Sequence, residues 1–237
     1  MTKPTILFLH GLGGSAAAYD SVVELLDPQN FTCIAHTSPG FGSRSDTSVP
    51  EHDLVDFYLD DLLEQHVLPD QTTLVAHSIA GVFAMRLVER LPGTSFRLVL
   101  LEANLIASDC GMLSRAFANA DPSEVDTLRT QCIDQFRHHA SAGWRNWADD
   151  VALPTPETIS SYCRTAVAHS DSGELLNAYL KHAGPKVYVY GDEYLGEPVL
   201  DALVSTPVHY VQGASHFLMP DAADKVAEII RVTSEME

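Results

Sequence analysis

Short runs of consecutive apolar residues constrain the fold of this chain most strongly. They lie at Thr5 to Leu9, Phe31 to Ala35, Thr73 to Val75, Phe96 to Leu101, Lys186 to Tyr190 and Val208 to Val211. Strands that are apolar at consecutive positions are buried on both faces, so these runs predict parallel strands. Segments with apolar residues three to four positions apart occur at Val22 to Leu26, Leu54 to Val67, Val82 to Leu91 and Ala222 to Val232. This alternation predicts an α/β fold, with a mostly parallel sheet of about six strands flanked by helices and a site at the carboxyl ends of the strands.

The alternation fails between residues 104 and 183. This segment contains no convincing strand, and its helical stretches are Cys110 to Ala120, Pro122 to His139 and Glu174 to His182. An insertion of this size after the carboxyl end of a strand is more typical of a lid than of a loop. We therefore predict a core of residues 1–103 and 184–237, with a helical lid formed by residues 104–183.

Charge and composition exclude several classes of partner. The 237 residues include 14 Lys and Arg against 32 Asp and Glu, a net charge of −18, which repels nucleic acid and anionic membrane surfaces. No apolar run approaches a membrane span, and the first residues lack the apolar core of a secretory signal. We expect a cytoplasmic protein with a small-molecule substrate, and the oligomeric state stays open. The cysteines lie far apart, without metal or redox spacing, at Cys33, Cys110, Cys132 and Cys163.

Two turns that follow predicted strands contain the candidate functional residues. The first strand runs into a glycine-rich loop at residues 10–15, whose backbone N–H groups could face a ligand. This loop lacks the spacing of a dinucleotide or phosphate loop, and alone it could be only a tight turn. The third strand leads into residues 76–81, Ala-His-Ser-Ile-Ala-Gly, which place Ser78 on a sharp turn before a helix. Small residues two before and two after a serine allow the backbone to fold closely there.

These features together resemble the α/β-hydrolase fold superfamily, in particular its lid-containing serine esterases and lactonases. The resemblance covers nearly the whole chain. It is carried by the His-Gly-Leu-Gly-Gly loop, Ser-Pro-Gly-Phe-Gly-Ser-Arg-Ser at residues 38–45, the Ser78 turn, and Ala-Ser-His-Phe at residues 214–217. Two departures stand out. Ala76 and Ala80 occupy the usual glycine positions, and the amino-terminal hairpin common in the fold is expected to be missing, as in plant methylesterases and hydroxynitrile lyases.

The resemblance implies a set of catalytic residues. Ser78 would be the nucleophile, His216 the base, and the backbone N–H groups of Leu12 and Ile79 the oxyanion hole. His77, beside the serine, is expected to point off the opposite side of the turn in a structural role.

The third member of the triad is open between two strand ends. Glu102 closes the fourth strand, where branches such as haloalkane dehalogenases and lactonases place a Glu that orients the histidine, and it is preferred here. Asp192 and Glu193 follow the fifth strand and are the alternatives, although many family members place the acid one residue later, at the position of Tyr194.

The implied activity is hydrolysis of a small to medium carboxylic ester, lactone or thioester through an acyl-enzyme at Ser78. No metal or organic cofactor is implied. A haloalkane dehalogenase is excluded because it needs an Asp nucleophile. A C–C bond hydrolase or a hydroxynitrile lyase would use the same triad, but the lyase needs a lid lysine, and the predicted lid offers only Lys181. A non-catalytic binding protein on the same fold is a further alternative.

Some side chains of the predicted lid could contact a substrate. Packing against the main domain is nevertheless the commoner role for the aromatic ones, which are Trp144, Trp147, Phe117, Phe136 and Tyr162. Arg115 and Arg145 could hold a substrate carboxylate, although a solvated surface position is expected for both. His138 and His139 are adjacent in sequence, so they face different sides of a helix and do not form a metal pair.

Overall fold

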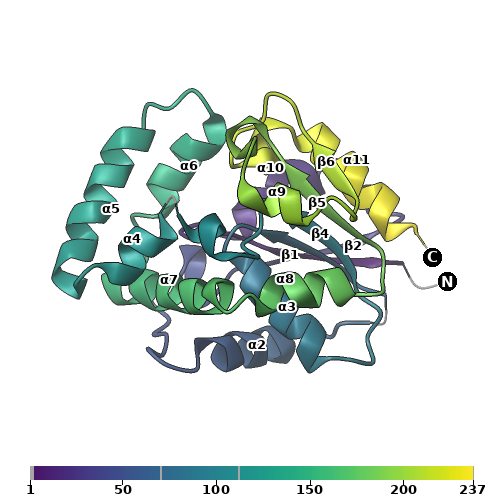
Figure 1. Cartoon of the computed structure of the whole chain (residues 1–237), viewed down its shortest axis with the longest axis horizontal. Coiled ribbons are helices and arrows are strands. Elements are labelled where there is room, and N and C mark those ends of the chain that lie inside the picture. Colours follow the sequence, from purple (N-terminus) through teal and green to yellow (C-terminus); the bar gives the residue numbers. More distant parts are fainter. Residues whose placement is uncertain (1–2, 70, 112, 237) are drawn as a thin grey trace.

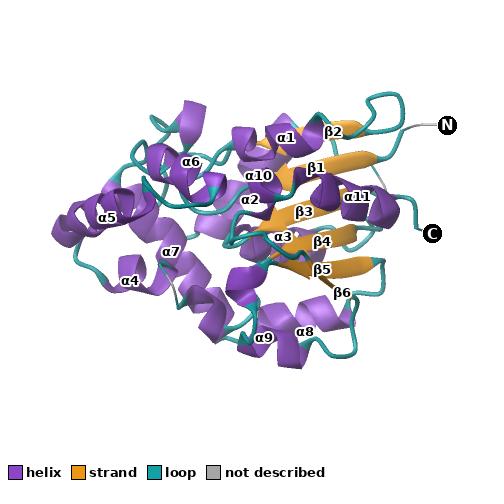
Figure 2. Ribbon diagram, turned by 90° about the horizontal axis from the view of Figure 1, so that it is seen from above, coloured by secondary structure: helices purple, strands orange, loops and turns teal. Residues whose placement is uncertain are grey.

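A computed structural model describes residues 3–69, 71–111 and 113–236 of the chain. Its sheet has six strands in the order β2-β1-β3-β4-β5-β6, and every neighbouring pair is parallel (Figure 2). The strands are β1 (Thr5–Leu9), β2 (Thr32–His36), β3 (Thr73–His77), β4 (Arg97–Leu101), β5 (Lys186–Tyr190) and β6 (Val208–Tyr210). The predicted strands are therefore confirmed to within two residues at each end. All residues of β1, β3 and β4 are buried, which explains their consecutive apolar positions.

Helices cover both faces of the sheet. The helices α1 (Asp20–Val23) and α11 (Ala223–Ser234) contact each other on one face, while α3 (Ala80–Arg90) lies on the other between α2 (Leu54–Gln65) and α8 (Glu174–Lys181) (Figures 1 and 2). Shorter helices follow the last strands, namely α9 (Pro198–Ala202) and α10 (Leu218–Asp221). Four short 3-10 helices complete the described elements: η1 (Ala16–Tyr19), η2 (Gly42–Arg44), η3 (Ala107–Cys110) and η4 (Asp192–Tyr194). The doubly wound α/β architecture predicted from the sequence is confirmed.

The described residues of the segment between β4 and β5 form helices joined by loops and turns, without a strand. Its helices are η3, α4 (Ser114–Asn119), α5 (Pro122–Phe136), α6 (Ala142–Asp150), α7 (Pro156–Asp171) and α8. Helices α4 to α7 lie beyond the carboxyl ends of the strands, on the left of Figure 1, whereas α8 packs beside α3 along the sheet. A lid function for residues 104–183 stays a prediction, and α8 lies with the helices of the core.

Some helix boundaries differ from the predicted ones. The helix expected at Val22 to Leu26 begins earlier, at Asp20, and its last turn tightens, since Leu25 and Leu26 donate hydrogen bonds only three residues back. The stretch from Cys110 to Ala120 divides into η3 and α4. No helix within the described ranges combines the length and the apolar character that crossing a membrane requires.

The central strands carry much of the folding free energy. Leu100 lies in β4 between β3 and β5 and has no exposed surface. Replacing it by Ala should lower the free energy of unfolding by about 2–5 kcal/mol, because the lost side chain leaves a cavity in a packed core. Urea unfolding measures this change. Leu195→Ala, at a side chain that is 57% exposed, should change stability by less than about 0.5 kcal/mol. Equal losses in both variants would contradict the assignment of the core.

Candidate active site

Ser78 lies on a strained turn between β3 and α3. Its backbone has φ of +55°, which is unfavourable for any residue with a Cβ atom. The turn is held by its neighbours: the Ser78 N–H donates to the carbonyl of Leu101 at 3.1 Å, and the Ser78 carbonyl accepts from Asn104 N–H at 2.9 Å. Gly81 allows this contact, since a Cβ atom there would lie 2.8 Å from Ala103 Cβ. The end of β4 therefore fixes the turn that presents the serine, and such local strain is typical of functional sites.

His216 is held by the buried carboxylate of Glu102. The Nδ1–H of His216 donates to Glu102 Oε2 at 2.6 Å, and Glu102 Oε1 accepts the backbone N–H of Gly191 at 2.7 Å. The Glu102 side chain is 0% exposed, while that of His216 is 15% exposed. Because Nδ1 carries the proton in this pair, the neutral ring keeps a lone pair on Nε2 that can accept a proton.

The position of the acid was open in the sequence, and the structure brings Glu102 rather than Asp192 to the histidine ring. Asp192 follows β5 but is exposed, and its Oδ1 accepts hydrogen bonds from Tyr210 Oη at 2.6 Å and Gly213 N–H at 3.0 Å. These bonds lower the pKa of Asp192, with the Tyr210 bond contributing most. Asp192 therefore stabilises the local loop.

Glu193 contacts His216, but through the backbone. One of its oxygens accepts the His216 N–H at 3.0 Å, and both accept from Trp144 Nε1, at 3.2 Å and 3.0 Å. The carboxylate thus joins α6 to the loop that carries the histidine. This is a positioning contact that the sequence did not indicate.

His77 lies against the histidine loop, so the expectation that it points away from the site is wrong. Its ring centroid is 4.6 Å from that of His216, and its Nε2–H donates to the His216 carbonyl at 2.9 Å. Burial is the largest of the effects that hold its pKa well below the usual value, so the ring is neutral. Its contact with the loop is consistent with the structural role expected from the sequence.

Two backbone N–H groups stand free beside Ser78. Within the described residues, neither Leu12 N–H nor Ile79 N–H donates a hydrogen bond. Ile79 caps the amino terminus of α3, where the helix dipole favours negative charge. The Leu12 carbonyl accepts Trp147 Nε1–H at 2.7 Å, which fixes the glycine-rich loop against α6. Neither N–H group is used elsewhere in the described structure, and the oxyanion hole stays a prediction.

Ser78 and His216 line the same small cavity, of about 50 Å³. No direct hydrogen bond joins the Ser78 hydroxyl to the His216 ring in this part of the described chain, and such bonds often form only once a substrate is bound. The other residues that line the cavity are Leu12, His77, Asp109, Leu113, Ser114, Trp144, Trp147, Tyr194 and Phe217. A neighbouring cavity of about 380 Å³ shares Trp147 and Phe217 with it, so these two side chains form the wall between the two spaces.

The predicted lid aromatics divide into two groups. Trp144 and Trp147 line the cavity, and the Trp144 ring lies 5.8 Å from the His216 ring at an interplanar angle of 29°. Phe136 supports them from behind, stacked on Trp144 at 4.0 Å. Phe117 is buried outside the cavity lining, and Tyr162 donates its hydroxyl to the carbonyl of Pro39. Only the two tryptophans are therefore placed to touch a substrate.

The charged candidates of the predicted lid lie outside this cavity. Arg115 pairs with Asp171, while Arg145 donates to the carbonyls of His139 and Ala140. Lys181 is exposed on α8. The described residues that line the cavity include neither Lys nor Arg. They therefore offer no such cation to bind a substrate carboxylate or to serve as the lysine of a lyase.

The polar wall of the cavity was not predicted from the sequence. Asp109 and Ser114 follow the end of β4, and Tyr194 lies in η4 after β5. The one feature of the sequence that could have indicated them is their position after the carboxyl ends of neighbouring strands. Within a long helical segment, this position is weak evidence for a functional role.

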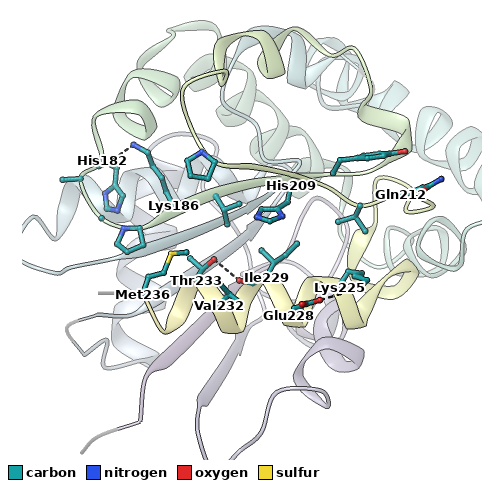
Figure 3. Close-up of a pocket in the computed structure, with 17 residues that line it drawn as sticks. His182, Lys186, His209, Gln212, Lys225, Glu228, Ile229, Val232, Thr233 and Met236 are labelled. Carbon is teal, nitrogen blue, oxygen red and sulfur yellow. Dashed lines mark hydrogen bonds and ion pairs between the residues drawn. The ribbon is translucent and has the colours of Figure 1, made fainter.

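Other cavities and clusters lie away from these residues. A groove of about 880 Å³ between β5, β6 and α11 contains none of the candidate catalytic residues (Figure 3). Its Lys186 ammonium donates to three carbonyls at the end of α8, those of Tyr179, Leu180 and His182. No three His, Cys, Asp or Glu side chains of the described residues gather in a way that could hold a metal ion.

Gly143 lets α6 approach the histidine loop closely. A Cβ atom at this position would lie 2.1 Å from Phe217 Cβ, so Gly143→Ala forces the two backbones apart. We expect a loss of about 1–3 kcal/mol in the free energy of unfolding, despite the better helix propensity of Ala. Thermal or urea unfolding measures it. Gly93→Ala is the control, because nothing lies within 4 Å of its added Cβ atom. A stabilised Gly143→Ala variant would contradict this packing.

His10 makes stability depend on pH beside the glycine-rich loop. Its Nδ1–H donates to the Gly11 carbonyl at 2.8 Å, and its Nε2 accepts Ser38 N–H at 3.0 Å. Burial lowers its pKa from 6.5 to about 4. The unfolded chain therefore binds a proton at pH 5 that the folded chain does not, so stability falls as the pH falls from 6.5 towards 4. This residue should contribute a loss on the order of 2 kcal/mol between pH 7 and pH 5.

Urea unfolding at both pH values tests this dependence in wild type and His10→Gln. The variant should lose less stability between them, although it is less stable throughout because Ser38 N–H loses its partner. Replacement of the exposed His138 by Gln serves as the control and should keep the wild-type dependence. An unchanged pH dependence in His10→Gln would show that His10 is not responsible.

Comparison with known proteins agrees with the fold. The sequence profile of the Alpha/beta hydrolase family matches residues 6–229. A pimeloyl-[acyl-carrier protein] methyl ester esterase of Aromatoleum aromaticum is 28% identical over 232 residues, covering 94% of this chain and 84% of that protein. An uncharacterized protein of Mycobacterium tuberculosis is 24% identical over 256 residues, covering 96% of this chain and 74% of the relative.

Solved structures extend the likeness to the whole fold. The crystal structure of a bromoperoxidase from Bacillus anthracis superposes with a TM-score of 0.72 at 21% identity, covering 99% of this chain and 93% of that one. Since the family profile spans nearly the entire sequence and the sheet has the matching parallel topology, this chain belongs to the alpha/beta hydrolase family.

Proposed function

We propose that this protein is a serine hydrolase that cleaves carboxylic esters, lactones or thioesters with small acyl groups. The observation that carries the proposal is the His216 ring, which is bonded through Nδ1 to buried Glu102 and lines one cavity with Ser78. A histidine oriented in this way, beside a serine on a strained turn, is the arrangement that activates a hydroxyl for attack on a carbonyl carbon.

The reaction follows from the roles of these groups. His216 Nε2 takes the proton of the Ser78 hydroxyl as its oxygen attacks the carbonyl carbon, and Glu102 stabilises the imidazolium that forms. The negative oxygen of the tetrahedral intermediate accepts hydrogen bonds from Leu12 N–H and Ile79 N–H. His216 then returns the proton to the leaving alcohol or thiol, and the acyl group stays on Ser78. A water molecule, activated by the same ring, releases the acid.

The size of the cavity limits the acyl group. Its volume of about 50 Å³ is well below that of typical ligand pockets, on the order of 300–1,000 Å³. This conformation therefore leaves little room beside Ser78. The cavity therefore favours acyl groups shorter than the pimeloyl chain in the name of the Aromatoleum relative.

Hydrolysis of p-nitrophenyl acetate, butyrate and octanoate by a set of variants tests the proposal. Ser78→Ala and His216→Ala should each lower kcat/KM by about 10³-fold or more, because each removes a step of proton transfer or attack. Glu102→Gln should cause a comparable loss, since Gln cannot stabilise the imidazolium. Wild type should prefer acetate to octanoate. Asp192→Asn is the matched control and should retain nearly the wild-type rate.

Labelling with a fluorophosphonate probe separates the alternatives. Attachment to Ser78 that is lost in His216→Ala would support an activated nucleophile. A folded wild-type protein that neither reacts with the probe nor hydrolyses any ester would overturn the proposal and favour a binding protein on the hydrolase fold. Loss of activity in Asp192→Asn, with Glu102→Gln unaffected, would show that the acid has been wrongly assigned.

A further inference from the structure

Asp109 is a carboxyl group of the cavity that the proposed reaction does not use. It lies in η3, shortly after β4, and its Oδ2 accepts the backbone N–H groups of Leu105 at 2.7 Å and Ile106 at 2.9 Å. Its main-chain carbonyl accepts from the side chain of Asn104 at 3.4 Å. The carboxyl is therefore held in one orientation by the same loop that follows Glu102.

The second oxygen of Asp109 makes no hydrogen bond of ordinary length and angle, although the Tyr194 side chain, which lines the same cavity, is close enough to interact with this carboxyl and lower its pKa. Oδ1 is buried and makes no hydrogen bond with the described protein atoms, although the residue lines the cavity that contains Ser78. Buried polar atoms nearly always find partners, because an unpaired one loses its interaction with water. An acceptor without an ordinary hydrogen bond, in a residue that lines a candidate active site, could pair with a substrate donor if the neighbouring Tyr194 side chain yields to it.

The charges around the cavity restrict what Asp109 could bind. Among the described residues that line it there is neither Lys nor Arg, and Asp109 is their only carboxylate. Burial raises the pKa of Asp109 to about 6, so near neutral pH the group is mainly an ionised acceptor. Such a wall repels an acyl group that bears a carboxylate and favours one that bears a hydrogen-bond donor.

We propose that Asp109 Oδ1 accepts a hydrogen bond from a hydroxyl or ammonium group on the acyl part of the substrate, so that the enzyme prefers esters of small hydroxy or amino acids. The inference rests on the proposed function of Ser78. The acyl part is the relevant half because it stays attached to Ser78 through both chemical steps.

The matched substrates are phenyl propionate, phenyl glycolate and phenyl glycinate. The first two differ mainly in a methyl group replaced by a hydroxyl, and the third supplies an ammonium group at the same place. The quantity measured is kcat/KM for each substituted ester divided by kcat/KM for propionate. Alkaline hydrolysis of the same esters in buffer gives the intrinsic reactivity ratio, against which the wild-type ratio is compared.

Asp109→Asn is the informative variant. Its amide oxygen can still accept the N–H groups of Leu105 and Ile106, while its NH₂ group presents donors to the cavity in place of an acceptor. We expect the wild-type ratio for glycolate or glycinate to exceed the intrinsic ratio roughly tenfold or more, and the variant to lose that excess. Asp192→Asn, with the same chemical change outside the cavity, should keep the wild-type ratio.

Each outcome decides the inference. If the wild-type ratio equals the intrinsic ratio for both substituted esters, the proposed role of Asp109 is wrong, while the proposed hydrolase activity still stands. This measurement uses only the wild-type protein. A ratio that persists in a folded Asp109→Asn variant also overturns the inference. An excess confined to glycolate identifies a hydroxyl donor, and one confined to glycinate an ammonium donor. If wild type hydrolyses none of the esters, the proposed function fails and the assignment of Asp109 fails with it.

Discussion

The buried carboxylate of Glu102 joins the parts of the candidate site. It directly follows β4, and its two oxygens accept hydrogen bonds from Gly191 after β5 and from the His216 ring after β6. An ionised carboxylate without exposed surface is costly unless both oxygens are paired, so the sheet and the histidine loop can adopt this arrangement only together. The residue itself has φ of +43°, which turns the chain back towards the Ser78 turn. The ends of β4 and β5 and the loop after β6 therefore meet at a single side chain.

Helix α6 is fastened to both of the loops that frame the cavity. Trp144 Nε1 and the His216 N–H share the carboxylate of Glu193, while Trp147 Nε1 donates to the Leu12 carbonyl. At the amino terminus of the helix, Asp221 accepts from the Ser141 hydroxyl at 2.9 Å. A helix of the segment expected to act as a lid is thus bonded to the histidine loop on one side and to the glycine-rich loop on the other. The wall of the cavity is built from the same contacts.

The fold could be predicted almost completely, because buried parallel strands leave a direct trace in the sequence. The runs at Thr5 to Leu9 and Lys186 to Tyr190 coincide with β1 and β5. The order of Ser78 and His216 followed from the family resemblance. The choice of Glu102 over Asp192 depends on how far each side chain reaches across the sheet, which spacing alone does not determine. Asp109 was missed because its role depends on an absent partner, and a sequence shows which groups exist but not which remain unpaired.

The charge of the cavity bears on how a reaction there would end. Hydrolysis converts a neutral acyl group into an acid that ionises at neutral pH. The cavity that receives the neutral group has Asp109 in its wall and the Glu102–His216 pair beside Ser78, in a chain of net charge −18. Like charges held close together in a partly buried space repel strongly. The product would therefore be expelled by the groups that oriented the substrate, so that its release would be fast and its inhibition of the enzyme weak.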